Sequence, residues 1–205
     1  MIDYQKIADS VTYYEKKGYN RMEVPWAVSQ YIANITKPDF KKHTLDNILL
    51  HNDKVLVASG EQSYLYLYLK NFMQKGRFQA ITPCFRHEKI DYMHSKYFMK
   101  NELIITDVVT EENLQKVIED AFIFFSQFIP KENLQIVKIA EDFGVYSYDI
   151  KCVFEGPKNE SNMIELGSYG IRECEFLKWI YATGLAEPRL SRAINLLERN
   201  ELSCK

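Results

Sequence analysis

Residues that suit phosphate and amine binding stand close together in the stretch Thr82-Pro83-Cys84-Phe85-Arg86-His87-Glu88. The apolar run 78–81 precedes it, which predicts a strand, and residues two apart on a strand point to the same face. The planar guanidinium of Arg86 suits a phosphate or a carboxylate, and the carboxylate of Glu88 accepts a hydrogen bond from an amine. The stretch therefore predicts one wall of a ligand pocket.

A second run, Tyr97-Phe98-Met99-Lys100-Asn101-Glu102, follows after a loop and is expected to pair with the first strand. Phe98 and Glu102 stand four residues apart, so they share a face of that strand. The two strands together predict the floor of a pocket for a nucleotide and a small zwitterion. The alternatives are structural: Arg86 would pair with Glu88 or Glu102, and Phe98 would be a core aromatic.

The elements around these strands predict an α+β fold, with helices flanking an antiparallel sheet. Helices are expected at 4–17, 63–75, 110–129 and 188–200. Strands are expected at 20–24, 77–87, 97–108, 134–140, 147–154, 162–167 and 175–183. Residues 38–55 show no clear period, and the alternating tyrosines and leucines of 64–69 indicate a strand when taken alone. Runs of adjacent strands between helices are typical of an antiparallel sheet rather than of repeated βαβ units.

Composition bounds the class of protein. The 205 residues are 46% hydrophobic, enough for one core, and we expect a single domain over 1–205. With 26 basic and 28 acidic residues the net charge is −2, which argues against a surface dedicated to nucleic acid. The four cysteines form no C-x-x-C pair, which suits the cytoplasm. No signal peptide or long apolar run is visible, so we expect no membrane insertion.

Six segments, in order, resemble the class II aminoacyl-tRNA synthetases, and most closely the seryl enzymes. The stretch at 82–88 with Phe98 and Glu102 resembles motif 2 of that family. The other five segments are Lys17-Gly18-Tyr19 through Glu23-Val24-Pro25 (motif 1), Ser59-Gly60-Glu61 (the T-x-E loop), Glu141-Asp142-Phe143-Gly144 with Tyr148-Asp149-Ile150, Glu165-Leu166-Gly167-Ser168, and Thr183-Gly184-Leu185-Ala186-Glu187-Pro188-Arg189 (motif 3). The resemblance also favours a helix over the ambiguous run at 64–69.

The resemblance implies an ATP site. Arg86 would hold the α-phosphate and the amino-acid carboxylate, and Arg189 would cover the adenine and reach the γ-phosphate, so these two are the candidate catalytic residues. Glu88 would accept the adenine amino group and Phe98 would stack on the ring. The bland alternative for Arg189 is a solvated arginine at the start of a helix. His87 alternates away from Arg86 and is expected to be structural.

An amino-acid site and a metal site are also implied. Glu61 and Glu102 would bind the α-ammonium and a substrate hydroxyl, with further contacts from the hydroxyls of Ser59 and Thr183; buried carboxylates are costly unless paired, so a charged substrate would complement them. Glu165 and Ser168 would hold the Mg²⁺ that accompanies ATP. The alternatives are surface glutamates and ordinary strand hydroxyls; these candidate positions are Ser59, Glu61, Glu102, Glu165, Ser168 and Thr183.

Two further possibilities are weighed. The loop residues Lys89, His94 and Lys96 suit pyrophosphate or an acceptor, and equally a solvated loop. Cys84 matches one position of a zinc site found in relatives of this family, but the motif 3 segment has no cysteine, so we reject zinc.

The resemblance therefore predicts an enzyme that uses ATP and Mg²⁺ to convert a small, serine-like amino acid into an aminoacyl-adenylate. The acceptor is a tRNA or a non-tRNA acceptor such as a carrier protein. No segment of the 205 residues resembles a tRNA-binding arm or an anticodon-binding domain, which favours a small acceptor, a carrier protein or a partner-bound tRNA over independent charging of tRNA. Tyr181, Pro188 and Gly167 depart from the seryl pattern, which puts serine specificity in doubt. A non-catalytic paralogue is the alternative, and a nucleic-acid-binding module has little support. Motif 1 implies a homodimer across 17–25.

Overall fold

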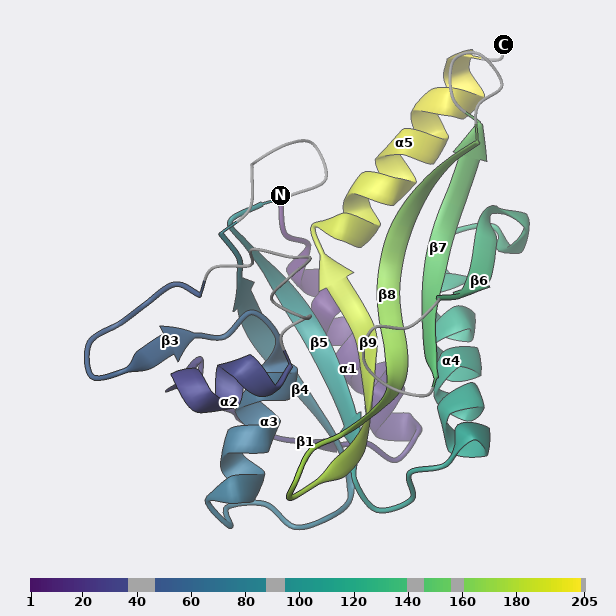
Figure 1. Ribbon diagram of the computed structural model, residues 1–205. Coiled ribbons are helices and arrows are strands. Elements are labelled where there is room, and N and C mark those ends of the chain that lie inside the picture. The colour runs from purple at the N-terminus through teal and green to yellow at the C-terminus, as the bar shows by residue number, and fades with distance from the viewer. Residues whose placement is uncertain (37–46, 88–94, 140–145, 156–160, 204–205) are drawn as a thin grey trace.

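The computed structural model describes residues 1–36, 47–87, 95–139, 146–155 and 161–203, and its centre is a seven-stranded sheet (Figure 1). The strands run in the order β1-β4-β5-β9-β8-β7-β6. Their bounds are β1 Asn20–Arg21, β4 Arg77–Phe85, β5 Tyr97–Ile105, β9 Lys178–Glu187, β8 Ser161–Glu173, β7 Ser147–Glu155 and β6 Leu134–Lys138. β1 is parallel to β4, and every other neighbouring pair is antiparallel. The predicted α+β fold is confirmed.

Helices cover both faces of the sheet. On one face lie the long helices α1 (Tyr4–Lys16), α4 (Glu111–Phe125) and α5 (Arg189–Ser203), which share a core cluster with it. On the other face, at the left of Figure 1, lie α2 (Gln30–Ile35) and α3 (Gly60–Leu69) with the hairpin β2 (Ala27–Ser29) and β3 (Lys54–Leu56). A short 3-10 turn, η1 (Lys131–Asn133), precedes β6.

Successive side chains of the central strands pack alternately against these two layers of helices. On β5, Leu103 and Ile105 join the cluster under α1 and α4, whereas Ile104 joins the cluster under α3. On β9, Ile180 packs with the first cluster and Trp179 with the second. Period-two alternation is what a sheet buried on both faces requires. Even-numbered residues of β5 therefore face α3, and this face carries the polar residues described below.

Side-chain caps set the helix starts. Asp3 caps α1 by accepting from the backbone N–H groups of Gln5 and Lys6, and Thr110 caps α4 as the sequence predicts. Ser59 caps α3, so this helix begins at Gly60 rather than at residue 63. The alternation of 64–69 does not make a strand, because α3 packs between the hairpin and the sheet and both its sides meet apolar neighbours.

Several predicted bounds are wrong. The strand expected at 162–167 runs to Glu173, and the one expected at 175–183 begins at Lys178 and runs to Glu187. These two strands form a hairpin closed by a bond from the Cys174 N–H to the Leu177 carbonyl, and no glycine or proline marks that turn. The strand expected at 20–24 shrinks to β1, while β2 and α2 were missed. The region 38–55 contains the start of β3, and its residues 38–46 lie outside the described residues.

No helix in the described part of the chain combines the length and the apolar character needed to cross a membrane.

Candidate functional site

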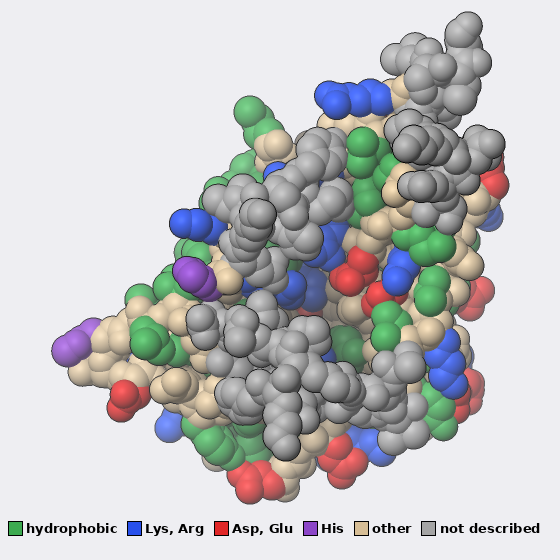
Figure 2. Space-filling model, turned by 45° about the horizontal axis from the view of Figure 1, so that its top comes forward, with side chains coloured by type: hydrophobic (Ala, Val, Ile, Leu, Met, Phe, Trp, Pro, Cys, Tyr) green, Lys and Arg blue, Asp and Glu red, His purple; other side chains and the backbone are tan. Residues whose placement is uncertain are grey.

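A pocket of about 270 Å³ opens between the N-terminal end of α3 and the strands β5, β8 and β9. In Figure 2, basic and acidic side chains gather in a hollow toward the centre of the view. Nine predicted site residues line this pocket: Ser59, Glu61, Arg86, Phe98, Glu102, Glu165, Ser168, Thr183 and Arg189. Glu88, the predicted partner of adenine, lies outside the described residues, as do Lys89, His94 and the segment 141–144.

Strand β5 supplies three side chains to the pocket. Phe98, Lys100 and Glu102 alternate along the strand and all line the cavity, as their spacing requires. Sequence reasoning named Phe98 and Glu102 and missed Lys100, although Lys100 stands on the same face midway between them.

A register shift on β9 brings motif 3 into the pocket. Asn101 of β5 pairs with Leu185 and Glu102 pairs with Thr183, which leaves Gly184 as an extra residue in β9. Because the extra residue reverses the alternation, Thr183 before it and Ala186 after it both line the pocket. A Cβ at Gly184 would lie 2.8 Å from the ring of Tyr14 beneath the sheet, so glycine is needed at this close approach.

A second register shift, between β7 and β8, positions the predicted metal residues. Ile150 pairs with Gly167 and Lys151 pairs with Glu165, so Leu166 is the extra residue. Glu165 and Ser168 are three apart and would face opposite sides of a regular strand. With Leu166 inserted, both line the pocket.

The start of α3 is held against the sheet by its first residues. The Ser59 hydroxyl accepts from the Glu61 N–H, and the Gly60 N–H donates to Oε2 of Glu102 at 3.2 Å. A Cβ at Gly60 would lie 2.6 Å from Oγ1 of Thr82, closer than real side chains approach. Glycine at this position therefore lets the helix end reach the strand that carries Glu102.

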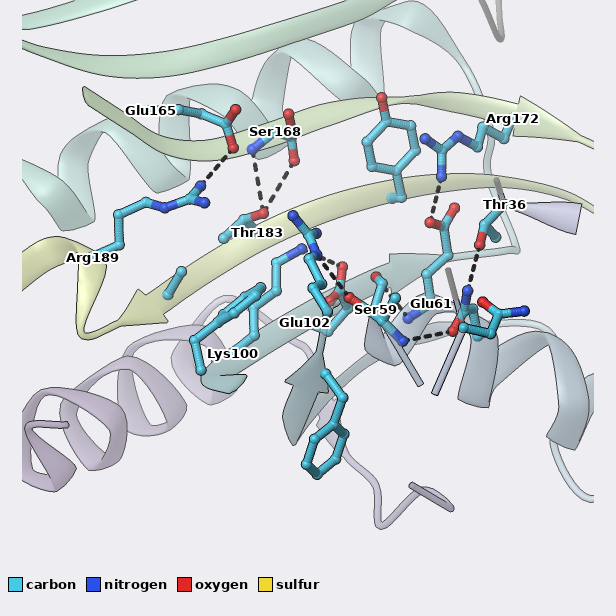
Figure 3. Close-up of a pocket in the computed structure, with 18 residues that line it drawn as sticks. Thr36, Ser59, Glu61, Lys100, Glu102, Glu165, Ser168, Arg172, Thr183 and Arg189 are labelled. Carbon is cyan, nitrogen blue, oxygen red and sulfur yellow. Dashed lines mark hydrogen bonds and ion pairs between the residues drawn. The ribbon is translucent and has the colours of Figure 1, made fainter. Parts of the chain in front are cut away.

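We call the part of the pocket formed by Glu61, Arg172 and Tyr181 the inner end; Glu61 and Arg172 are labelled at the right of Figure 3. Oε2 of Glu61 lies 2.5 Å from Nη1 of Arg172, and Oε1 accepts from the indole N–H of Trp179 at 2.6 Å. The Arg172 guanidinium stands over the Tyr181 ring, 4.2 Å from its centroid. Burial alone would lower the pKa of Arg172, but the Glu61 carboxylate outweighs it and the pKa is raised.

Arg172 was missed because the strand that carries it was predicted to end at residue 167. In the sequence, Arg172 is a lone arginine two residues after a glycine, and that pattern does not predict a site. Tyr181 was noticed only as a departure from the seryl pattern. The structure shows that these two residues lie against each other at one end of the same pocket.

Both glutamates predicted to bind the substrate are already in ion pairs. Glu102 is buried and its Oε1 lies 2.8 Å from Nζ of Lys100, which is also buried. Glu61 is paired with Arg172 as described above. The expectation that a charged substrate would complement two open carboxylates needs correction, because Lys100 and Arg172 supply that compensation within the protein.

We call the part of the pocket formed by Phe98, Glu165 and Arg189 the outer end. Glu165 and Arg189 are labelled at the left of Figure 3. Nη1 of Arg189 donates to Oε1 of Glu165 at 2.8 Å. The guanidinium carbon of Arg189 lies 5.9 Å from the centroid of the Phe98 ring, and that of Arg86 lies 5.1 Å from it. An aromatic ring with two guanidinium groups near it is a suitable surface for a planar base next to phosphates.

The side-chain atoms of Glu165, Ser168 and Asp149 that could bind a metal ion are oxygens. The Ser168 hydroxyl donates to Oδ1 of Asp149 at 2.6 Å. Burial raises the pKa of Asp149, and the negative charge of Glu165 raises it further. Carboxylate and hydroxyl oxygens fit Mg²⁺, which commonly takes one or two protein carboxylates and completes its shell with phosphates and water. In the described residues no cluster of three or more histidine, cysteine or acidic side chains could hold a metal without such help.

Cys84, the residue weighed for zinc, is fully buried on β4, and burial raises the pKa of its thiol to about 11. A thiol with that pKa is protonated at neutral pH, whereas zinc binds the thiolate.

Comparison with known families identifies the chain. The family model described as "tRNA synthetases class II core domain (F)" matches residues 42–188. The chain belongs to this family. The match includes both motif 2 strands and the register-shifted strand β9, so the predicted resemblance to a class II synthetase core is confirmed. No curated protein matches the sequence.

Solved class II synthetases share the fold. The cytoplasmic serine-tRNA ligase from Naegleria fowleri in complex with AMP has a TM-score of 0.69 and 16% identity, covering 93% of this chain and 52% of that one. The seryl-tRNA synthetase from Pyrococcus horikoshii complexed with ATP gives 0.70 and 16%, covering 90% and 47%. The pyrrolysyl-tRNA synthetase from Desulfitobacterium hafniense gives 0.67 and 16%, covering 96% and 70%. The chain thus spans about half the length of the two seryl enzymes.

Proposed function

We propose that this class II synthetase core activates a small amino acid with ATP, forming an aminoacyl-adenylate and pyrophosphate. The observation that carries the proposal is the joint lining of one pocket by Arg86, Phe98 and Arg189 together with Glu61 and Glu102. The two arginines and the phenylalanine suit a nucleoside triphosphate, and the two glutamates suit an amino acid. Two of the solved structures with this fold contain AMP or ATP, which supports a nucleotide in this pocket.

The reaction is an in-line displacement at phosphorus. An oxygen of the amino-acid carboxylate attacks the α-phosphorus and forms a P–O bond while the bond to the bridging oxygen breaks. The electron pair leaves with pyrophosphate. Arg86 lines the pocket with its guanidinium carbon 5.1 Å from the centroid of the Phe98 ring, and this group would hold the carboxylate and the α-phosphate and stabilise the charge that develops on the phosphorus oxygens.

The outer end would receive the base. Adenine would stack on Phe98, with Arg189 on its opposite face and near the γ-phosphate. Arg189 must move outward to admit the base, and its present partner Glu165 is partly exposed. Exposed ion pairs contribute only about 0–1 kcal/mol, so this movement costs little. Glu165 and Ser168 would then be available to Mg²⁺, which would neutralise charge on the phosphates.

The activated group would pass to a tRNA or to a carrier protein. The near-neutral charge of the chain favours an acceptor that is small, or one delivered by a partner, over independent binding of a whole tRNA. A non-catalytic paralogue is not favoured, because the phosphate-binding arginines and the aromatic ring all remain in the pocket.

The test is ATP–pyrophosphate exchange, screened across all amino acids, for the wild type and Arg86→Ala. Loss of one donor to a developing negative charge costs about 10²–10³ in rate, so the variant should exchange at about 1% of the wild-type rate or less. Lys116→Ala, at an exposed residue of α4 far from the pocket lining, is the matched loss of a positive charge and should leave exchange unchanged. Equal exchange in Arg86→Ala and the wild type would show that the site is wrongly placed.

A further inference from the structure

Two residues that line the pocket carry a side-chain N–H group that no described residue accepts from. Among the described residues, four buried side-chain atoms have no hydrogen-bond partner: Asn47 Nδ2, Thr82 Oγ1, Asn101 Oδ1 and Arg172 Nε. Of these residues, Asn47 and Arg172 line the pocket. Their unpartnered N–H groups are themselves buried, so they indicate a local excess of donors over acceptors, and contact with a ligand falls to the rest of each side chain.

Arg172 is also held rigidly in place. Its guanidinium lies over the Tyr181 ring, and the Tyr181 hydroxyl is in turn 3.3 Å from Oγ of Ser147. A guanidinium has five N–H donors, and Glu61 accepts from one nitrogen of Arg172. Stacking fixes the plane of the group, and a fixed fork suits the two oxygens of a carboxylate.

A count of charges shows a surplus of positive charge at this site once a substrate is bound. An amino acid with a neutral side chain brings one carboxylate, which the proposed reaction places at Arg86, and one ammonium, which suits Glu61 or Glu102. When the ammonium shares either glutamate, the paired cation loses part of its compensation. That cation, which is Arg172 for Glu61 or Lys100 for Glu102, would then lie largely buried beside a substrate that offers it no second anion.

We propose that the inner end binds a second carboxylate through Arg172, so that the substrate is a small amino acid with an acidic side chain rather than serine. This inference rests on the proposed function, because it takes the reacting carboxylate to lie at Arg86. Glu61, held by Arg172 and Trp179, faces the same space and accepts the substrate ammonium. The substrate ammonium would thus meet Glu61 and the substrate's side-chain carboxylate would meet Arg172, and these two protein residues are already neighbours.

The first experiment compares isosteres on the wild-type protein and therefore needs no variant to fold. Calorimetry with a non-hydrolysable ATP analogue and Mg²⁺ would measure the binding of aspartate, asparagine, glutamate, glutamine and serine. Hydrogen bonds to charged groups are stronger than neutral ones, so one acidic amino acid should bind at least about tenfold more tightly than its amide. Pyrophosphate exchange with the same five amino acids runs in parallel.

Variants then test the residue itself. Arg172→Gln should bring the affinities for the acid and its amide within about twofold, and Arg172→Lys, which keeps the charge and loses the fork, should restore part of the preference. Lys116→Gln is the control for the loss of a positive charge elsewhere. A thermal melt checks that each variant is folded.

The outcomes separate the two proposals. Equal binding of an acid and its amide, tighter binding of serine, or no binding of either acidic amino acid overturns the inference, while exchange with a neutral amino acid leaves the proposed function standing. Acid-selective binding without any exchange supports the inference and shows that adenylation is the wrong reaction. Acid-selective binding with acid-selective exchange supports both.

Discussion

Two arginine–glutamate pairs stand at opposite ends of the same pocket, and they differ in the burial of the glutamate. At the inner end the side chains of Arg172 and Glu61 are 24% and 4% exposed. At the outer end those of Arg189 and Glu165 are 21% and 43% exposed. The inner glutamate uses both oxygens on protein donors, whereas the outer one accepts from Arg189 and keeps a large share of its surface in solvent.

Burial decides what each pair can do. A buried pair costs much to break, because removing one partner leaves a charge without water or counter-charge. An exposed pair is screened and exchanges its partner for water at little cost. Under the proposed function, the inner end would therefore be a fixed recognition surface, and the outer end would open for a large ligand. The predictions below break each pair in turn, from the largest expected effect to the smallest.

Removing the inner glutamate should destabilise the fold most. Glu61→Ala leaves Arg172 buried without its counter-charge and the Trp179 N–H without an acceptor. Loss of one partner of a buried pair costs about 3–5 kcal/mol, which should lower the urea midpoint with little change in the slope. Glu165→Ala removes the outer glutamate and should cost about 1 kcal/mol or less. Similar losses in the two variants would mean that the ends do not differ as described.

Removing the outer arginine should affect ATP more than stability. Arg189→Ala breaks an exposed pair, so the free energy of unfolding should fall by about 1 kcal/mol or less. A charged hydrogen bond to phosphate contributes about 1.5–3 kcal/mol, so the dissociation constant for ATP, measured by calorimetry with Mg²⁺, should rise by about 10–100-fold. Arg77→Ala, a β4 arginine bonded to Asn113 outside the pocket, should not weaken ATP binding. Unchanged ATP affinity in Arg189→Ala would place the base elsewhere.

Glu187 is another buried carboxylate, and it sharpens the comparison because its oxygens accept from the backbone N–H groups of Asp3 and Ser191 and from the Ser191 hydroxyl. Glu187 is fully buried, its Oε1 accepts from Ser191, and burial raises its pKa. The folded protein then binds this proton more readily than the unfolded chain, so stability falls as the pH rises from about 4.5 through the raised value. Glutamine is neutral at every pH, so Glu187→Gln should gain thermal stability relative to the wild type as the pH rises above about 4.5.

The gain should be the smallest of the three effects, below the about 2–4 °C that 1 kcal/mol produces in a domain of this size. Glu173→Gln, at an exposed carboxylate of β8, controls for the general loss of a negative charge. A relative melting temperature for Glu187→Gln that stays constant across the pH range, or that falls as the pH rises, would contradict the sign argued above.

The sequence allowed prediction of the outer end and the middle of the pocket better than the inner end. Arg86, Phe98 and Arg189 lie in motifs whose residue types and order are recognisable, and period-two alternation places Phe98 and Glu102 on one face. Lys100 followed from the same alternation and was overlooked.

The inner end depends on features without a local signal. Arg172 lines the pocket only because β8 continues past residue 167, and that length is set by pairing with β9. The register shifts at Leu166 and Gly184 reverse the alternation of two strands, so spacing alone places Glu165 and Ser168 on opposite faces. The ion pair between Glu61 and Arg172 joins residues far apart in the chain, and periodicity carries no information about it, whereas Lys100 and Glu102 stand two apart on one face of β5.

Gly60 has a consequence for anyone who wishes to change what the pocket accepts. A methyl group there would lie 2.6 Å from Oγ1 of Thr82 and 3.0 Å from the Cβ of Glu102. The absence of a side chain at position 60 therefore sets how closely α3 approaches the sheet. Replacing it would push Glu61 away from β8 without altering any residue that touches a ligand. Position 60, together with a compensating smaller residue at position 82, is thus an engineering handle on the width of the cavity.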